Sequence, residues 1–300
     1  MPIAHAGELA ALATASCWVA TALAFEAAGR RIGSLTVNLL RLLIAIALGA
    51  LAAWWLRGQV LPLDATAHAW GWLALSGLVG FTFGDLCLFR AFVVLGPRLS
   101  TLMMALAPPL TVVVGWSVLG ETMSGRDLLG MTLTVVGVAW AILDRGAATP
   151  AAKEAPRTTL WGVALGFGGA LGQAVGLVLS KLGMGDYDPF AATQIRVLAG
   201  TVGYVVLFTL LRRWRQVGRS LGDRRALAFT SVGAFFGPFL GVSLSLVAIR
   251  YTTTGVAASL MATTPILIIP VVVLLGRERV RLGGWLGAVV AVAGVVLLFG

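Results

Sequence analysis

The feature that most constrains this chain is an internal duplication. A short pattern of a proline, an acidic residue and two glycines occurs twice, and each member lies 157 residues from its partner. The pairs are Pro108 and Pro265, Glu121 and Glu278, Gly130 and Gly287, and Gly137 and Gly294. Nearer the start of each copy the offset is 155 residues, as between Arg41 and Arg196. This spacing predicts one structural unit that is built twice.

Long apolar segments indicate that both units fold in lipid. Of the 300 residues, 59% are hydrophobic and 11% are charged, whereas about 25% of the residues of a soluble domain are charged. A bilayer core of roughly 30 Å needs about 20 apolar residues for each helical crossing. We therefore predict an all-α integral membrane protein with ten transmembrane helices. The expected segments are 8–28, 34–56, 70–94, 98–119, 127–143, 159–180, 190–211, 226–249, 254–275 and 282–299.

The two copies predict two five-helix repeats, at residues 1–145 and 159–300. Between them, residues 146–158 are small, polar and contain two prolines, which is typical of a linker. Because five is odd, the second copy must enter the membrane from the opposite side. Inverted repeats recur in secondary transporters, whose halves can exchange shapes around a midplane site. We expect inverted repeats around a central cavity.

The net charge of +10 could indicate a nucleic-acid partner, but its distribution favours membrane topology. Of the 22 Lys and Arg residues, fifteen fall in the loops after the first, third, fifth, seventh and ninth segments, and only four on the other side. Cytoplasmic loops carry such an excess. We therefore predict a bacterial-type inner membrane protein with both termini outside and no nucleic-acid partner.

The sequence provides little for catalysis or metal binding. The histidines, His5 and His68, lie near the terminus and in a loop, and the cysteines, Cys17 and Cys87, lie within apolar segments. No cluster has metal-ligand spacing. We expect no cofactor, no metal and no enzyme activity, with a small-molecule substrate and the lipid bilayer as partners of a chain that could act as a monomer.

The duplicated pattern resembles the EamA-type signature of the drug/metabolite transporter superfamily over nearly the whole chain. In this resemblance Arg277 replaces the glycine that precedes the acidic residue, present in the first copy as Gly120. The family resemblance implies a central cavity lined by the first, third, fourth, sixth, eighth and ninth helices, with the fifth and tenth helices at the periphery. The sequence is also similar to bacterial amino-acid and metabolite exporters of the YddG type, which implies neutral or aromatic amino acids as substrates.

Asp85 is the most notable ionisable residue inside a predicted span, because charge at membrane depth is costly and needs a partner or a function. Its repeat counterpart is Val242, so the symmetry is broken there. Two interpretations are open: contact with a substrate amine or a proton, or pairing with an intramembrane cation such as Arg41 or Arg90.

Arg41 and Arg196 are predicted structural or gating residues. We expect ion pairs with Glu26 for Arg41 and with Asp186 or Asp188 for Arg196; contact with a substrate carboxylate is the alternative.

The other paired elements are also assigned structural or gating roles. Glu121 and Glu278 would form ion pairs at helix ends, and Pro108 and Pro265 would shape or hinge the helices in which they lie.

Polar and aromatic side chains on the helices expected around the cavity are candidates for substrate binding, with ordinary helix packing as the alternative for each. Trp18 and Gln173 are repeat counterparts and differ chemically. The predicted substrate-binding residues are Trp18, Thr82, Phe83, Asp85, Thr101, Met104, Gln173, Phe239, Ser243, Ser245 and Thr264.

Taken together, these features predict a secondary-type exporter of small metabolites, most of all amino acids, that works by alternating access without obligatory ion coupling. A passive channel or facilitator for small solutes is the nearest alternative. A membrane-embedded enzyme is the alternative from another class, and the missing catalytic residues argue against it.

Overall fold

The computed structural model describes residues 5–119, 124–144, 156–185, 187–251, 260–276 and 280–299, and the regular elements in these ranges are helices. The first half contains α1 (Ala6–Ile32), α2 (Ser34–Arg57), α3 (Ala67–Gly77), the π-helix η1 (Leu78–Gly84), α4 (Asp85–Leu95), α5 (Pro97–Met104), α6 (Ala107–Leu119) and α7 (Gly125–Leu143). The second contains α8 (Pro156–Met184), α9 (Pro189–Leu210), α10 (Trp214–Ser220), α11 (Arg224–Ala234), the π-helix η3 (Phe235–Gly241), α12 (Val242–Tyr251), α14 (Thr264–Leu274) and α15 (Leu282–Phe299).

The lengths and composition of these helices are those of a multi-pass membrane protein. Eight stretches are long and apolar enough to cross a bilayer: Ala6–Ile32, Ser34–Trp55, Ala67–Leu95, Pro97–Val118, Gly125–Leu143, Leu160–Met184, Phe190–Leu210 and Arg224–Ser245. Two shorter apolar helices, Thr264–Leu274 and Leu282–Leu297, occupy the positions of the last two expected crossings. The count of ten crossings stays a prediction.

The helix boundaries repeat with the offset found in the sequence. The π-helices η1 and η3 cover Leu78–Gly84 and Phe235–Gly241, so both of their ends are 157 residues apart. Pro238 lies inside η3 and has no N–H to donate, which fits the widened hydrogen-bonding pattern of a π-helix. Each of the two π-helices therefore interrupts a membrane helix at the same place in its repeat.

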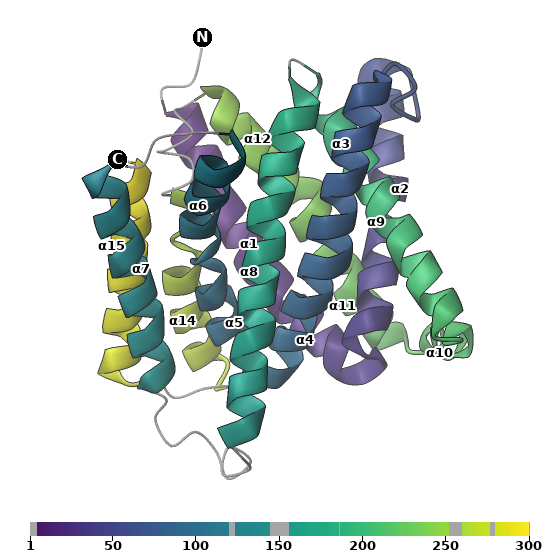
Figure 1. The fold of residues 1–300 in the computed structure, drawn as a ribbon. Coiled ribbons are helices and arrows are strands. Elements are labelled where there is room, and N and C mark those ends of the chain that lie inside the picture. The colour runs from purple at the N-terminus through teal and green to yellow at the C-terminus, as the bar shows by residue number, and fades with distance from the viewer. Residues whose placement is uncertain are drawn as a thin grey trace.

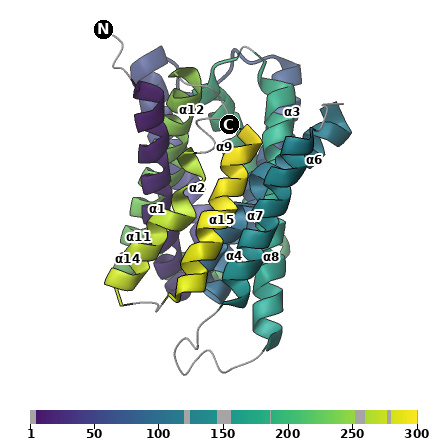
Figure 2. The same ribbon diagram turned by 90° about the vertical axis from the view of Figure 1, so that its left-hand side faces the viewer.

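The two repeats run in opposite directions. In Figures 1 and 2, α1 runs down from the end of the bundle where the N-terminus lies, whereas its counterpart α8 runs up toward that end. The equivalent helices α7 and α15 pack side by side and antiparallel at the edge of the bundle, with Gly137 against Gly287 and Gly130 against Gly294. The four motif glycines thus form the close contact between α7 and α15, because helices approach this closely only where a side chain is absent.

Charge divides the two ends of the bundle. α1 begins and α15 ends at one end, which we call the termini face (Figure 1). The opposite end, the basic face, contains the end of α1, the α5 start, the short helix α10 and the starts of α11 and α15. Its described basic residues are Arg30, Arg31, Arg98, Arg212, Arg213, Arg215, Arg219, Arg224, Arg225 and Arg281.

Candidate functional site

A buried ion pair lies between helices of the first repeat. Asp85 is the first residue of α4, directly after η1, and Arg41 lies on α2; each is only 4% exposed. The Arg41 guanidinium donates to Oδ2 of Asp85. Removing two charges from water is costly, and such a pair persists only with good geometry and further hydrogen bonds.

Two amides supply those further hydrogen bonds. Gln173 of α8 donates from Nε2 to Oδ1 of Asp85 at 3.0 Å, so both carboxylate oxygens have partners. Asn38, one turn before Arg41 on α2, accepts from Arg41 Nε at 2.9 Å and donates to the backbone carbonyl of Asp85 at 3.1 Å. The cluster therefore joins α2, α4 and α8, and α8 belongs to the other repeat.

Arg196, the repeat counterpart of Arg41, approaches the same carboxylate. It interacts electrostatically with Asp85, and its guanidinium lies 5.0 Å from the centre of the Phe81 ring. The Arg41 guanidinium lies 4.5 Å from the Phe89 ring and 5.8 Å from Phe81. Aromatic faces stabilise cations at such distances. Because Arg196 Nε is buried without a hydrogen-bond partner, the two arginines share one carboxylate unequally.

The prediction that Arg41 forms an ion pair with Glu26 was wrong. Glu26 pairs with Arg30, one turn further along α1, and Arg41 pairs with Asp85. This pairing was one of the two interpretations left open for Asp85, whereas the other cation considered, Arg90, is exposed.

Of the two partners expected for Arg196, the structure describes Asp188, which caps a helix. Asp188 accepts a hydrogen bond from the backbone N–H of Ala191 at 2.8 Å and caps the N-terminus of α9. Asp186 lies outside the described residues.

Trp18 and Gln173, repeat counterparts that differ chemically, lie in equivalent interfaces. Trp18 of α1 packs against Gly241 at the end of η3, and Gln173 of α8 lies beside Gly84 at the end of η1. Gln173 with Asp85 in one interface thus corresponds to Trp18 with Val242 in the other. The symmetry between the repeats is therefore broken at both positions of this pair, which is polar in one interface and apolar in the other.

Among the other predicted binding residues, Thr82 has a packing role. Its hydroxyl donates to the carbonyl of Gly200 on α9 at 3.2 Å, and the Tyr204 hydroxyl donates to the Thr82 carbonyl at 3.2 Å. Phe83, the next residue, is 49% exposed. Met104 is half-buried and packs against two hydrophobic clusters, each of which contains residues of both repeats.

The remaining hydroxyl candidates each donate to a backbone carbonyl three or four residues earlier in the chain. Thr101 donates to the Arg98 carbonyl at 2.9 Å, Ser243 to Phe239 at 2.5 Å, Ser245 to Val242 at 2.7 Å and Thr264 to Met261 at 2.8 Å. These bonds are the ordinary packing alternative for membrane helices. Phe239 is half-buried, with its ring 5.6 Å from that of Phe235.

The paired prolines follow paired helix breaks. Residues 105–106 separate α5 from α6, residues 262–263 form the equivalent turn before α14, and Pro108 and Pro265 lie in the first turns of the helices that follow. A first-turn proline lacks only an N–H that has no helical partner. Their hinge role stays a prediction, and Glu121 and Glu278 lie outside the described residues.

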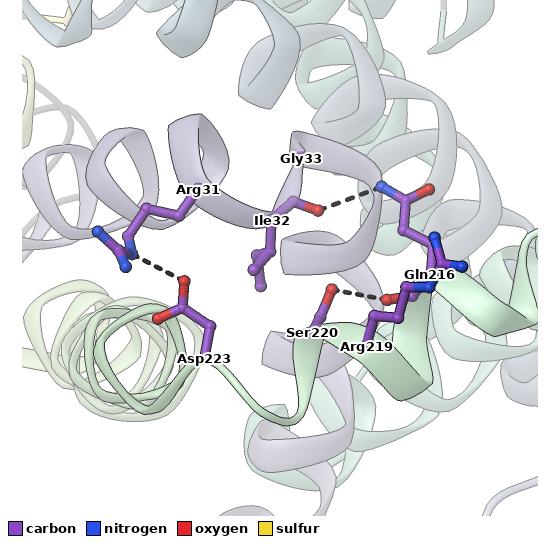
Figure 3. Close-up of a pocket in the computed structure, with 7 residues that line it drawn as sticks. All are labelled: Arg31, Ile32, Gly33, Gln216, Arg219, Ser220 and Asp223. Atoms are coloured by element: carbon purple, nitrogen blue, oxygen red, sulfur yellow. Dashed lines mark hydrogen bonds and ion pairs between the residues drawn. The ribbon is translucent and has the colours of Figure 1, made fainter.

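Two pockets lined by described residues lie at the ends of helices. Neither of them is the expected midplane cavity, and that cavity stays a prediction. One, of about 280 Å³, is beside the start of α3 and includes His68 and Trp72. The other, of about 350 Å³, is on the basic face (Figure 3). There Arg31 donates to Asp223 at 2.9 Å, and Gln216 donates to the Ile32 carbonyl at 3.3 Å.

The Asp223 carboxylate joins α1 to the start of α11. Hydrogen bonds from the Ala226 N–H and from Arg31 lower the pKa of Asp223 below its ordinary value. Because the pKa is lowered, the stability from this contact is fully present above the pKa that Asp223 has in the unfolded chain. It is lost as the pH falls through the pKa that Asp223 has in the folded protein. The basic face is therefore held by an ionised carboxylate at neutral pH.

Asn38, Phe89 and Tyr204 contribute to the site without having been predicted as members. For Asn38 a signal existed, because a polar residue three positions before an intramembrane arginine lies on the same helix face. No comparable signal existed for the aromatic residues, whose positions relative to Arg41 depend on tertiary packing. In the parts of the chain that the structure describes, no three His, Cys, Asp or Glu residues are grouped as metal ligands.

Inverted helical repeats, antiparallel contact between equivalent helices and a buried ion pair that Gln173 links to the other half define a polytopic membrane protein with transporter-like architecture. The model of the EamA-like transporter family matches residues 5–143 and 160–300, and the chain belongs to this family. Its members are transporters and not enzymes.

Comparison with solved structures agrees on the fold. A protein described only as "Crystal structure of protein" superposes on this chain with a TM-score of 0.60 at 19% sequence identity. The match covers 97% of this chain and 95% of the other. A search of curated proteins found no match.

Proposed function

We propose that this EamA-family transporter exports small neutral or aromatic amino acids, or similar metabolites, by alternating access. The basic face would be cytoplasmic and both termini external, with ten crossings in all. The substrate class follows from the sequence resemblance to YddG-type exporters. The mechanism is supported by the packing of the two repeats, which differs at the two ends of the bundle.

That difference in packing is the observation that carries the proposal. At the basic face one hydrophobic cluster joins five helices through Phe25 of α1, Leu40 of α2, Phe89 of α4, Ala226 of α11 and Ile268 of α14. We call it the basic-face cluster. Its aromatic centre is tight, with the Phe25 and Phe89 rings 4.7 Å apart.

The equivalent cluster at the termini face is smaller. It contains Ala69 and Leu73 of α3 with Ala192 and Ile195 of α9, and Ala69 and Ile195 are the repeat counterparts of Ala226 and Leu40. Within the described residues this cluster includes no member from α12 or α6, the counterparts of α4 and α14. A separate cluster joins α12 to α1 through Ala248 and Ala10.

Two equivalent halves in different packing states are what an alternating-access carrier requires. The protein would here be closed at the basic face and open toward the termini face, and exchange of the two packings between the repeats would reverse the opening. A passive channel would need a continuous path, which the joined helices at the basic face do not favour.

Flux in proteoliposomes tests the function. With a panel of radiolabelled neutral, aromatic and acidic amino acids, we expect saturable uptake of neutral or aromatic members, and acceleration when unlabelled substrate is present on the opposite side. A channel would give flux without saturation or acceleration. Absence of flux for the whole panel would contradict the amino-acid assignment.

Proton coupling is tested in the same vesicles. Both oxygens of Asp85 are bonded to protein groups, so we expect substrate flux to persist without a proton gradient. Glu8→Gln, near the N-terminus, is the control for Asp85→Asn. A gradient requirement that disappears only in Asp85→Asn would contradict transport without obligatory coupling.

Thiol labelling tests the orientation. Gly218 on α10 and Gly125 at the start of α7 are exposed, and an added Cβ would meet no atom within 4 Å at either position. In a chain lacking Cys17 and Cys87, an impermeant maleimide added to intact cells should label Gly125→Cys and not Gly218→Cys. The reverse pattern would overturn the proposed topology.

A further inference from the structure

The packing of α4 differs from that of its repeat equivalent, α12. Each of these helices packs closely against the first helix of the other repeat: α4 against α8, and α12 against α1. However, α4 also packs against α1 and α2 of its own repeat, whereas α12 has no comparable packing against α8 and α9 among the described residues. The contacts of α4 with α1 and α2 are therefore specific to the closed end.

The Arg41–Asp85 ion pair crosses this state-specific interface. Arg41 lies on α2 and Asp85 on α4, and the Arg41 guanidinium also lies over Phe89 of the basic-face cluster. The Gln173–Asp85 bond, in contrast, crosses the α8–α4 interface, whose equivalent is packed in the other half as well. Exchange of packing between the repeats would separate Arg41 from Asp85 but would leave Gln173 with it.

The second repeat has an arginine equivalent to Arg41 but no carboxylate equivalent to Asp85. Arg196 is the counterpart of Arg41, but Val242 stands at the position equivalent to Asp85. When α9 and α12 come together in the opposite shape, no charge pair can form between them at this position. One of the two shapes thus has a buried ion pair that the other lacks.

We propose that Arg41 and Asp85 are positioning residues that hold the basic face closed and, because Val242 replaces the second carboxylate, make the termini-face-open shape the resting state. This inference rests on the proposed alternating access. Gln173 orients the carboxylate in both shapes, and Arg196 attracts it when Arg41 has moved away.

The experiment measures accessibility without substrate. In a chain lacking Cys17 and Cys87, Ala28→Cys reports the basic face, because Ala28 is fully buried in the basic-face cluster. Ser245→Cys on α12, half-buried, reports the termini face. Maleimide labelling rates of both reporters are compared in purified protein in nanodiscs. The test variant is Asp85→Asn, and the control is Glu8→Gln, a half-buried carboxylate near the N-terminus.

We expect Asp85→Asn to raise labelling at Ala28→Cys and lower it at Ser245→Cys, each by about tenfold, a shift within the usual range of coupling between states. Glu8→Gln should change neither. If the ion pair only supports the fold, both reporters would become more reactive together, or neither would change, and the proposal would be overturned.

A second variant keeps the test decisive if Asp85→Asn folds poorly. Val242→Asp supplies the missing carboxylate, which would face Arg196 when α9 and α12 come together. It should shift both labelling rates in the same directions, because it strengthens the opposite shape. Unchanged rates in a well-folded Val242→Asp protein would count against the proposal. Since labelling needs no substrate, these outcomes are independent of whether any amino acid is transported.

Discussion

Replacing Gly137 with alanine is expected to destabilise the folded protein by about 1–3 kcal/mol, the usual cost of inserting a group into a packed interface. A Cβ at this position would lie 2.3 Å from the backbone nitrogen of Ala291 and 2.7 Å from the carbonyl oxygen of Gly287. Backbone atoms cannot rotate away as a side chain can, so α7 and α15 would have to separate. The thermal midpoint of the purified protein in detergent, followed by fluorescence-detected size exclusion, measures the effect.

Gly71→Ala is the matched control. Gly71 is an exposed glycine of α3, and an added Cβ there would meet no atom within 4 Å. Alanine is favoured over glycine inside helices by about 1 kcal/mol, so this variant should be neutral or stabilising. Equal loss of stability in both variants would mean that the close contact between α7 and α15 does not decide the effect.

Replacing Arg41 with methionine should cost about 3–5 kcal/mol, because removal of one partner leaves a buried charge without its main counterion. Asp85 would keep the hydrogen bond from Gln173 and the attraction of Arg196, which cannot reproduce the direct bond from Arg41. We expect a large fall in the thermal midpoint and in the yield of monodisperse protein.

The double variant Arg41→Met with Asp85→Leu tests the cause. An apolar replacement of both partners removes the uncompensated carboxylate, and such replacements are often nearly neutral. Recovery should be partial, since Arg196 then loses its attraction to Asp85. A double variant no more stable than Arg41→Met alone would show that shape and not charge controls stability at this position.

Much of the fold could be predicted from the sequence because lipid imposes simple rules. Apolar length sets where helices cross, and constant offsets of 155 and 157 residues define two copies of an odd number of segments. The equivalent π-helices and the antiparallel α7–α15 pair agree with that prediction. Helix breaks inside the spans were not predicted in detail, since hydropathy does not distinguish a π-helix from an α-helix.

Less of the candidate site than of the fold could be predicted from the sequence. Asp85 and Gln173 were singled out because the copies disagree there, and the structure joins them by a 3.0 Å hydrogen bond. The partner of Arg41 was predicted wrongly as Glu26, the nearest acidic residue of the preceding helix. Sequence distance could not decide between Glu26 and Asp85, because the choice depends on how α2 rotates against α1 and α4.

The sequence alone determined that the chain is a duplicated helical membrane protein, because hydrophobic length and repeat spacing are properties of the chain itself. Only the tertiary structure decided which charges meet and which end of the bundle has the larger hydrophobic cluster. The two nearly equivalent halves pack differently at the two ends of the bundle. The physical difference lies in side-chain contacts between distant segments, above all where Asp85 faces Arg41 and Val242 provides no equivalent.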